Sequence, residues 1–216
     1  WLGPSTVHVL DLCCGSGRFA RRLAADGRTV TGVDMSEDMI TRARGQWDPA
    51  DVAALPGATF VCADALTLDL GKIFNAVLIG GLSISVLDDR ESRIALLRAA
   101  RRHLAPGGTL IFDYMPFPEM GSDDESYHTF PFPGEGGQAF MVLGVLQSPS
   151  NGVQVTNMYS ELIDSGNRTQ RFLSAETVSY LSDEDLREEL DQANFRTVEK
   201  VDMTPVSPQG SGKVGR

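Results

Sequence analysis

Short apolar runs alternate with helix-like stretches along the first half of this chain, and no other feature constrains the fold as strongly. The runs are rich in strand-forming residues and are bounded by Gly, Asp or Pro, as buried strands are. They cover residues 7–12, 29–35, 59–64, 76–81 and 109–115. The helix-like stretches cover Arg18–Ala25, Glu37–Gly45 and Arg90–Leu104. Strands that alternate with helices indicate βαβ units, so we predict an α/β fold whose sheet is mainly parallel, with flanking helices.

The second half of the chain has a different pattern. Residues 116–138 are rich in Pro, Gly and acidic residues, and they predict a long loop of the kind that forms functional lids. Turn residues such as Asn151-Gly152 then separate three strand-like runs, which predicts an antiparallel meander. The runs cover 139–147, 153–163 and 171–180, and they are followed by a capped amphipathic helix over 182–193, a last strand over 195–203 and a loose tail over 204–216.

Charge and cysteine content argue against several classes of protein. The chain has 19 Lys+Arg against 29 Asp+Glu, a net charge of −10, so most of its surface would repel a nucleic acid. No run approaches the roughly 18 apolar residues of a membrane-spanning helix, and the first residues lack the pattern of a signal peptide. The three cysteines form neither a disulfide framework nor a zinc-site spacing. We therefore expect a cytoplasmic protein with no metal, nucleic-acid or membrane partner.

The segment VLDLCCGSGRFA, at the end of the first strand-like run, carries the clearest chemistry. Gly15 and Gly17 predict a tight turn whose backbone N–H groups approach a ligand, followed by the positive end of a helix. With Asp34 about 20 residues on, the pattern also matches the dinucleotide fingerprint. Asp11, directly before the turn, would repel a pyrophosphate and suits a ligand with an ammonium group. The later segment HLAPGGTLIFDY has no part in the dinucleotide fingerprint.

Five segments occur in the order seen in one known family, and with them the chain resembles class I S-adenosylmethionine (SAM)-dependent methyltransferases. The segments are VLDLCCGSG (9–17), VTGVDMSEDMI (30–40), FVCADALTL (60–68), FNAVLIGGLSISVL (74–87) and LAPGGTLIFD (104–113). They cover about the first half of the chain. The meander and the segment 180–195 further resemble small-molecule methyltransferases, which insert an antiparallel sheet after the fifth strand of a Rossmann-like core.

The resemblance implies an organisation of the 216 residues. It implies a SAM-binding Rossmann-like core (1–115), a lid loop (116–138), an antiparallel insertion over the acceptor site (139–181), the last helix and strand of the core (182–203) and a tail (204–216). Two positions depart from the family pattern. Asn75 stands where Asp is common, and Asn194 replaces the usual Gly before Phe195, so its backbone would need a left-handed conformation, which Asn tolerates.

The resemblance also assigns the cofactor residues. It places Asp11 near the methionine amino group, Gly15 and Gly17 against the cofactor backbone, and Asp34 on both ribose hydroxyls, for which a carboxylate has enough lone pairs. The remaining cofactor contacts that it implies are Cys13 and Ser16 in the turn, Met35 and Met39 on the adenine, Asp64 and Ala65 at the adenine edge, and Gly80 beside the transferred methyl group.

The acceptor side is less constrained by the sequence. Methyl transfer from a sulfonium needs mainly alignment and exclusion of water, with a general base as an option. Histidine is the residue type most often used as a base near neutral pH, which makes His128 a candidate, and Tyr114 follows the fifth strand, where α/β ligands bind. Tyr127, Arg168 and Arg171 are candidate substrate contacts, and arginines facing the cleft would favour an anionic acceptor. Each of these side chains could equally be an ordinary solvated residue.

The resulting interpretation is a SAM-dependent methyltransferase that transfers a methyl group to N or O, with C also open, of a small metabolite in natural-product biosynthesis. An amino sugar nucleotide and an acidic metabolite are the leading acceptors, and a homodimer is one option for the oligomeric state. Two alternatives stay open. An NAD(P)-binding oxidoreductase would need a catalytic set such as Tyr-x-x-x-Lys, which does not occur. A non-catalytic SAM-binding regulator would keep the fold but transfer nothing.

Overall fold

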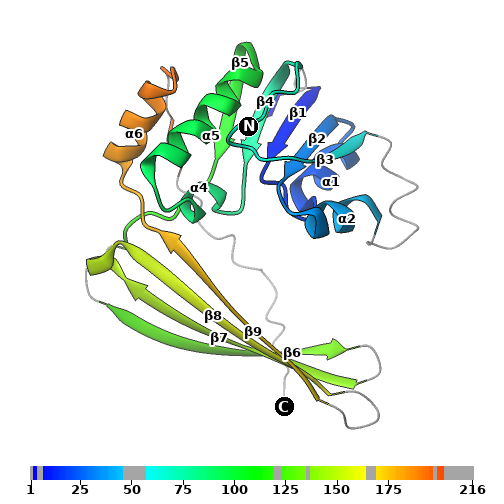
Figure 1. Ribbon diagram of the computed structural model, residues 1–216, viewed down its shortest axis with the longest axis vertical. Helices are drawn as coiled ribbons and strands as arrows, with labels where there is room; N and C mark the ends of the chain where they lie inside the picture. The colour runs from blue at the N-terminus through cyan, green and yellow to red at the C-terminus, as the bar shows by residue number, and fades with distance from the viewer. Residues whose placement is uncertain are drawn as a thin grey trace, which may run out of the picture.

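The described residues form two β-sheets, one parallel and one antiparallel, together with several helices (Figure 1). The computed structural model describes residues 2–3, 7–45, 57–118, 123–134, 137–163, 169–196 and 199–201. In the first sheet all neighbouring strands are parallel, in the order β3-β2-β1-β4-β5. Its strands are β1 (His8–Leu12), β2 (Thr29–Asp34), β3 (Ala58–Cys62), β4 (Phe74–Ile79) and β5 (Leu104–Phe112). The predicted α/β architecture is confirmed.

Helices cover both faces of the parallel sheet. They are α1 (Arg18–Ala25), α2 (Glu37–Gly45), α4 (Ser83–Val86), α5 (Arg90–His103) and α6 (Asp183–Gln192). The α5 helix packs on β4 and β5, and it also contacts α6, whereas α1 and α2 pack on β2 and β3. Asp89 and Ser182 cap α5 and α6, since their side chains accept hydrogen bonds from the backbone N–H groups of Ser92 and Asp185. Helices α1, α2, α5 and α6 lie within a residue or two of the stretches that the sequence predicts, whereas the short helix α4 is not predicted.

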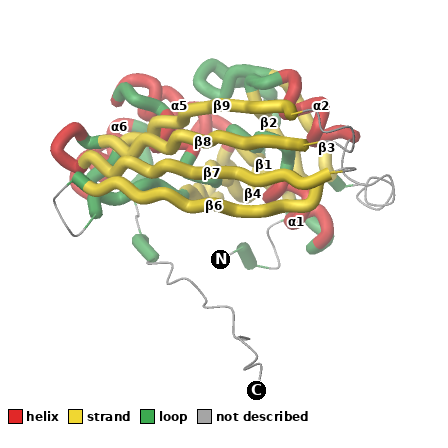
Figure 2. Tube along the Cα trace, turned by 90° about the horizontal axis from the view of Figure 1, so that it is seen from below, coloured by secondary structure: helices red, strands yellow, loops and turns green. Residues whose placement is uncertain are grey.

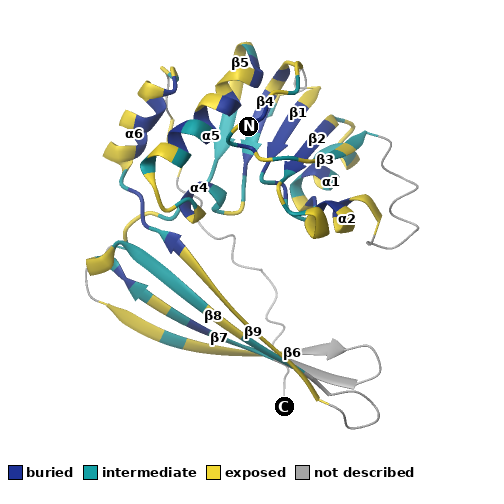
Figure 3. Cartoon of the chain, viewed as in Figure 1, coloured by how far each residue is buried: buried dark blue, intermediate teal, exposed yellow. Residues whose placement is uncertain are grey.

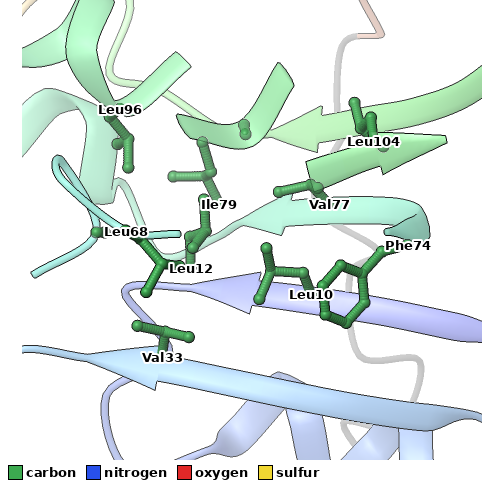
Figure 4. Close-up of a cluster of buried hydrophobic side chains, with 11 residues drawn as sticks. Leu10, Leu12, Val33, Leu68, Phe74, Val77, Ile79, Leu96 and Leu104 are labelled. Carbon is green, nitrogen blue, oxygen red and sulfur yellow. The ribbon is translucent and has the colours of Figure 1, made fainter. Parts of the chain in front are cut away.

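The core is divided between the two faces because successive side chains of a strand point in opposite directions. Leu10 and Leu12 of β1 lie in the larger cluster, with Val77, Ile79 and Leu96 (Figure 4). Val9, their neighbour in β1, lies in a smaller cluster with Ala20 of α1, Val30 and Ala76. All of these residues are almost fully buried.

The connection from β3 to β4 contains a turn in place of a crossover helix. Buried His103, at the end of α5, holds this connection in place. One ring nitrogen, Nδ1, lies 2.7 Å from the carbonyl oxygen of Ala99, and the other, Nε2, lies 3.0 Å from the backbone nitrogen of Leu70. Since the Leu70 N–H must donate, Nε2 accepts this bond and Nδ1 carries the proton.

The second sheet contains one more strand than the sequence predicts. Its strands are β6 (Asp124–Gly134), β7 (Gly137–Ser148), β8 (Val153–Ile163) and β9 (Thr169–Ser179), all antiparallel. The prediction of a lid loop over 116–138 is therefore wrong, because β6 pairs with β7 from Asp124 to Gly134. Pro131 and Pro133 are untypical of strands, so the sequence predicts no strand here. The structure tolerates both prolines because β6 is an edge strand of the sheet. The turn before β8 is a 3₁₀ turn over Pro149–Asn151, closed by Gly152 with a φ of 70°.

The final strand expected over residues 195–203 is not formed by the residues that are described there, namely Phe195, Arg196 and Glu199–Val201. Residues 197–198 and the tail from 202 onward lie outside the described residues. The left-handed backbone expected at Asn194 is confirmed, with a φ of 64° just after α6. The described helices include none that is long and apolar enough to cross a membrane.

The antiparallel sheet lies across the carboxyl ends of the parallel strands (Figures 1 and 2). The chain crosses between the two sheets at two points that lie side by side, because Leu181 donates its N–H to the carbonyl oxygen of Met115 and forms a bridge with Pro116. Most described side chains of the antiparallel sheet are exposed or half-buried, whereas β1, β2 and β4 of the parallel sheet are mostly buried (Figure 3). This arrangement places a second layer over the edge where α/β proteins bind ligands.

Candidate cofactor and acceptor site

Asp11 lies at the carboxyl edge of the sheet, where its side chain is buried without a full set of partners. The residue is 1% exposed, and its Oδ2 atom has no hydrogen-bond partner among the described residues. Burial raises the pKa of Asp11 to about 7; the nearby charge of Asp34 adds to this rise, and the backbone N–H of Ala20 opposes it. A buried carboxylate oxygen with a free lone pair is a site for a cationic hydrogen-bond donor.

We expect this buried carboxyl to make the stability of the ligand-free protein depend on pH. Between the unfolded pKa of 3.8 and the folded pKa of about 7, the folded state holds one more proton than the unfolded state. The free energy of unfolding should therefore fall as the pH rises through this window, by up to about 1.4 kcal/mol per pH unit. Asp11→Asn should remove this contribution, whereas Asp26→Asn, at an exposed position, should not. Urea unfolding at several pH values measures it, and equal pH slopes for Asp11→Asn and the wild type would contradict it.

The turn after β1 brings the backbone close to the strand ends. Cys13, Gly15 and Gly17 all have positive φ angles, of 58°, 54° and 81°. A Cβ atom on Gly17 would lie 2.8 Å from Cε1 of Phe60, so glycine is required there by both its φ angle and the space. Burial raises the pKa of Cys13 to about 12, and that of Cys14 also rises, so both remain thiols at neutral pH and are not nucleophiles.

Asp34 joins the end of β2 to this turn. Its Oδ2 atom accepts the N–H of Gly15 at 2.8 Å, and its Oδ1 atom accepts the N–H of Ser36 at 2.9 Å. Each carboxylate oxygen keeps a further lone pair for a ligand hydroxyl. Asp34 and Asp11 thus place two carboxylates on either side of the glycine turn, as the sequence predicts.

The residues expected around an adenine lie beside this turn, on the exposed side. Met35 is 78% exposed and Met39 37% exposed, so two large apolar side chains face solvent after β2. Asp64 is exposed, with its Oδ1 atom accepting the N–H of Leu66 at 2.8 Å, and Ala65 is buried. Exposed apolar surface next to a carboxylate suits a flat ring with an exocyclic amino group.

A second turn, after β4, faces the glycine turn. A Cβ atom on Gly80 would lie 2.6 Å from Cε2 of Phe19, the second residue of α1, so the two segments touch. Gly81 and Leu82 both have left-handed backbones, with φ angles of 73° and 63°. Asp113 accepts the N–H groups of both residues, at 3.2 and 2.9 Å. In the sequence Asp113 merely ends the segment LAPGGTLIFD, and only the structure shows that it holds this strained turn in place.

Tyr114, one of the two predicted catalytic residues, has its hydroxyl group bonded to another side chain. It donates to Asp183 at the start of α6, and Nζ of Lys200 lies 3.0 Å from both oxygens of the same carboxylate. Burial and the bond to Asp183 raise the pKa of Tyr114. The hydroxyl is therefore poorly placed to accept a proton from an acceptor molecule.

The acceptor-side residues lie on the antiparallel sheet, on different faces. Tyr127 and His128 are neighbours in β6, so their side chains point to opposite faces and cannot both face the same ligand. His128 stacks with Phe130, with ring centroids 6.3 Å apart. Tyr127 donates its hydroxyl to Glu125, and Arg171 lies 3.6 Å from Glu161. Arg171 is therefore already paired with an acid, and Arg168 lies outside the described residues.

The part of the chain that contains the glycine turn matches a known protein family. Residues 9–108 match the family described as "Methyltransferase domain". This segment is a class I SAM-dependent methyltransferase domain. The buried unpaired oxygen of Asp11 and the carboxylate of Asp34 beside Gly15 and Gly17 fit this cofactor, which carries an ammonium group and two ribose hydroxyls. The resemblance found in the sequence is confirmed for the domain.

Two curated relatives each match about half of the chain. A dTDP-3-amino-3,4,6-trideoxy-alpha-D-glucopyranose N,N-dimethyltransferase from Streptomyces venezuelae is 31% identical over 120 residues, which are 56% of this chain and 47% of the relative. Glycine N-methyltransferase from Rattus norvegicus is 33% identical over 116 residues, 50% of this chain and 40% of the relative. The chain thus matches about half the length of these relatives.

Solved structures match both sheets. The sugar N-methyltransferase KedS8 from Streptoalloteichus sp. has a TM-score of 0.75 and 24% identity, with 88% of this chain and 72% of that chain covered. SAM-bound CalS10, an amino pentose methyltransferase from Micromonospora echinaspora, has a TM-score of 0.72 and 24% identity, with 88% and 75% covered. The methyltransferase domain and the antiparallel sheet inserted after β5 therefore occur together in solved proteins.

Proposed function

We propose that this chain is a SAM-dependent N-methyltransferase whose acceptor is the amino group of a small amino sugar carried on a nucleotide. The observation that carries the proposal is the buried, unpaired Oδ2 atom of Asp11 beside the glycine turn, which calls for a cationic ligand at the strand ends. The antiparallel sheet across the same edge supports a small acceptor enclosed between two layers (Figure 1). Relatives that methylate amino sugars support the acceptor class.

The residues of this chain would bind and align. SAM supplies a methyl group already activated on a sulfonium, so the protein needs mainly to orient the acceptor and exclude water. Asp11 would hold the ammonium group of the cofactor, and Asp34 its ribose hydroxyls. Asp113 would keep the Gly80–Leu82 turn in its strained form beside the reacting atoms. The antiparallel sheet would keep bulk water from the strand ends.

A protonated amine must lose a proton before it can attack a methyl group. Of the two residues that the sequence suggests as catalytic, we propose His128 as the base, because the Tyr114 hydroxyl is held by Asp183. His128 is exposed on β6 and has an aromatic neighbour, Phe130, on the same face. Tyr127, on the opposite face, provides a matched control in the same strand.

The experiment that tests the function is release of S-adenosylhomocysteine from SAM in the presence of candidate acceptors. The panel contains dTDP-linked 3-amino and 4-amino sugars, the free amino sugars, glycine and a phenol. We expect turnover with an amino sugar nucleotide, and slower turnover in His128→Asn than in Tyr127→Phe. SAM binding without transfer to any acceptor would favour a regulator. Thermal stabilisation by NAD and not by SAM would favour an oxidoreductase.

We further propose that the chain forms a homodimer through the antiparallel sheet. Both faces of this sheet carry exposed apolar side chains: Phe130 and Phe172 on one face, Tyr127 and Leu173 on the other. Only one face can lie toward the parallel sheet, so the other is left for a second copy, and two-fold dimers are the commonest assembly. Light scattering tests this proposal; a monomer across the micromolar range would refute it.

The three cysteines Cys13, Cys14 and Cys62 are all free thiols. Because free thiols persist in a reducing compartment, we propose the cytoplasm as the location of the protein.

A further inference from the structure

We infer that Arg18 binds the methionine carboxylate of SAM, so that Arg18 and Asp11 together hold the two charged groups of the cofactor's amino acid end. The inference rests on the proposed function, because it takes SAM as the ligand at this edge. Arg18 is absent from the residues that the family resemblance assigns. It is the first residue of α1, directly after Gly17, and its side chain is exposed.

The guanidinium group of Arg18 is held in a defined place. Its Cζ atom lies 4.7 Å from the centroid of the Phe19 ring. That ring in turn lies against Gly80, where a Cβ atom would come within 2.6 Å of it. The Nη2 atom of Arg18 lies 3.9 Å from the position that a Cβ atom on Gly81 would take. The guanidinium is therefore stacked on an aromatic ring and reaches from α1 to the turn after β4.

This cation has no acidic partner within the described part of the chain, whereas the other two arginines of α1 are engaged. No hydrogen bond or ion pair is found for Arg18 among the described residues, and its one polar contact is with the Phe19 ring. Arg21 donates to the carbonyl oxygen of Ala43, and Nε of Arg22 lies 4.0 Å from Asp26. Of the three, Arg18 thus has a guanidinium free to bind an anion.

The charges around the site explain why an anion would need this residue. Asp11, Asp34 and Asp113 all lie at the ends of the parallel strands, so a carboxylate entering there meets three acids. The amino acid end of SAM carries both an ammonium and a carboxylate. Asp11 offers an unpaired buried oxygen to the first, and Arg18, at the positive end of α1, offers N–H donors to the second. The two side chains flank the same glycine turn.

Calorimetric binding of two ligands tests the inference without any turnover. S-adenosylhomocysteine carries the carboxylate, whereas 5′-methylthioadenosine has the same nucleoside and no amino acid. We expect Arg18→Gln to weaken binding of S-adenosylhomocysteine about tenfold or more and to leave methylthioadenosine binding within about twofold. Arg18→Lys should recover part of the loss. Arg22→Gln, one helical turn further along α1, is the matched control and should change neither affinity.

Three results would overturn the inference and leave the proposed function intact. Equal binding of S-adenosylhomocysteine by Arg18→Gln and the wild type would exclude the contact. Equal weakening of both ligands would show that Arg18 only supports the fold of the site. An unchanged cofactor affinity with a raised KM for the acceptor would assign Arg18 to the acceptor. A wild-type protein that binds neither SAM nor S-adenosylhomocysteine would refute the proposed function itself, and the inference with it.

Discussion

Replacing Glu189 with glutamine should lower the free energy of unfolding by about 3–5 kcal/mol, the largest stability change that we expect from a single substitution. Glu189 of α6 and Arg93 of α5 form an ion pair whose side chains are 1% and 9% exposed. Arg93 donates through Nε and Nη2 to the carboxylate, at 2.7 to 3.2 Å, and through Nη1 to the carbonyl oxygen of Leu87. Without the carboxylate, a buried guanidinium would keep its charge and lose its counter-ion.

The neighbouring residue provides a matched control. Glu188 also pairs with an arginine of α5, Arg90, at 2.7 Å, but the two side chains are 57% and 41% exposed. Because solvent screens such a pair, Glu188→Gln should cost less than about 1 kcal/mol. Urea unfolding followed by circular dichroism measures both variants. Similar losses in the two would show that burial does not govern the strength of the contact between α5 and α6.

Replacing Asp34 with alanine should weaken SAM binding by at least about 100-fold, the largest effect on binding that we expect. Two hydrogen bonds from ribose hydroxyls to a carboxylate contribute about 1.5–3 kcal/mol each. The substitution also removes the acceptor of the Gly15 and Ser36 N–H groups, so the glycine turn loses its link to β2. Calorimetry with SAM and with 5′-methylthioadenosine measures the loss.

The two ligands separate Asp34 from Arg18. Both contain the ribose, so Asp34→Ala should weaken both, whereas Arg18→Gln should affect only a ligand with a carboxylate. Asp38→Ala, at an exposed position in the first turn of α2, is the control and should change binding less than about twofold. An Asp34→Ala protein that binds SAM as tightly as the wild type would rule out the assigned ribose contact and with it the cofactor position described above.

The sequence was sufficient for the parallel half of the fold because its signals are local there. Strand-like runs, helix caps such as Ser182 and the glycine turn each depend on a few neighbouring residues. The parallel strands came out within a few residues of their predicted bounds, except that β5 begins at Leu104. The carboxylates Asp11 and Asp34 could be placed for the same reason, since residues that end parallel strands meet at one edge of the sheet.

The antiparallel half was predicted less well because its strands depend on partners distant in sequence. Residues 124–134, with two prolines and two acids, resemble a loop by composition. They form a strand because β7 pairs with them along their whole length. The other side of β6 is a free edge, where a proline costs no hydrogen bond of the sheet. The same strand separates two candidate site residues. Tyr127 and His128 are neighbours in β6 and therefore point to opposite faces of the sheet, a restriction that a loop would not impose.

The amino acid order by itself thus determined the kind of sheet, its helices and the acids that follow its strands, since periodicity and turn chemistry act over short distances. Tertiary structure alone decided which charged groups have partners. Asp113 is bound to a turn 31 and 32 residues away, and Arg93 of one helix is bound to Glu189 of another. Arg18 stacks on Phe19, and its donors have no partner among the described residues. Whether a charge is paired depends on contacts between segments that only folding brings together, and the chemistry of the site depends on the charges that folding leaves unpaired.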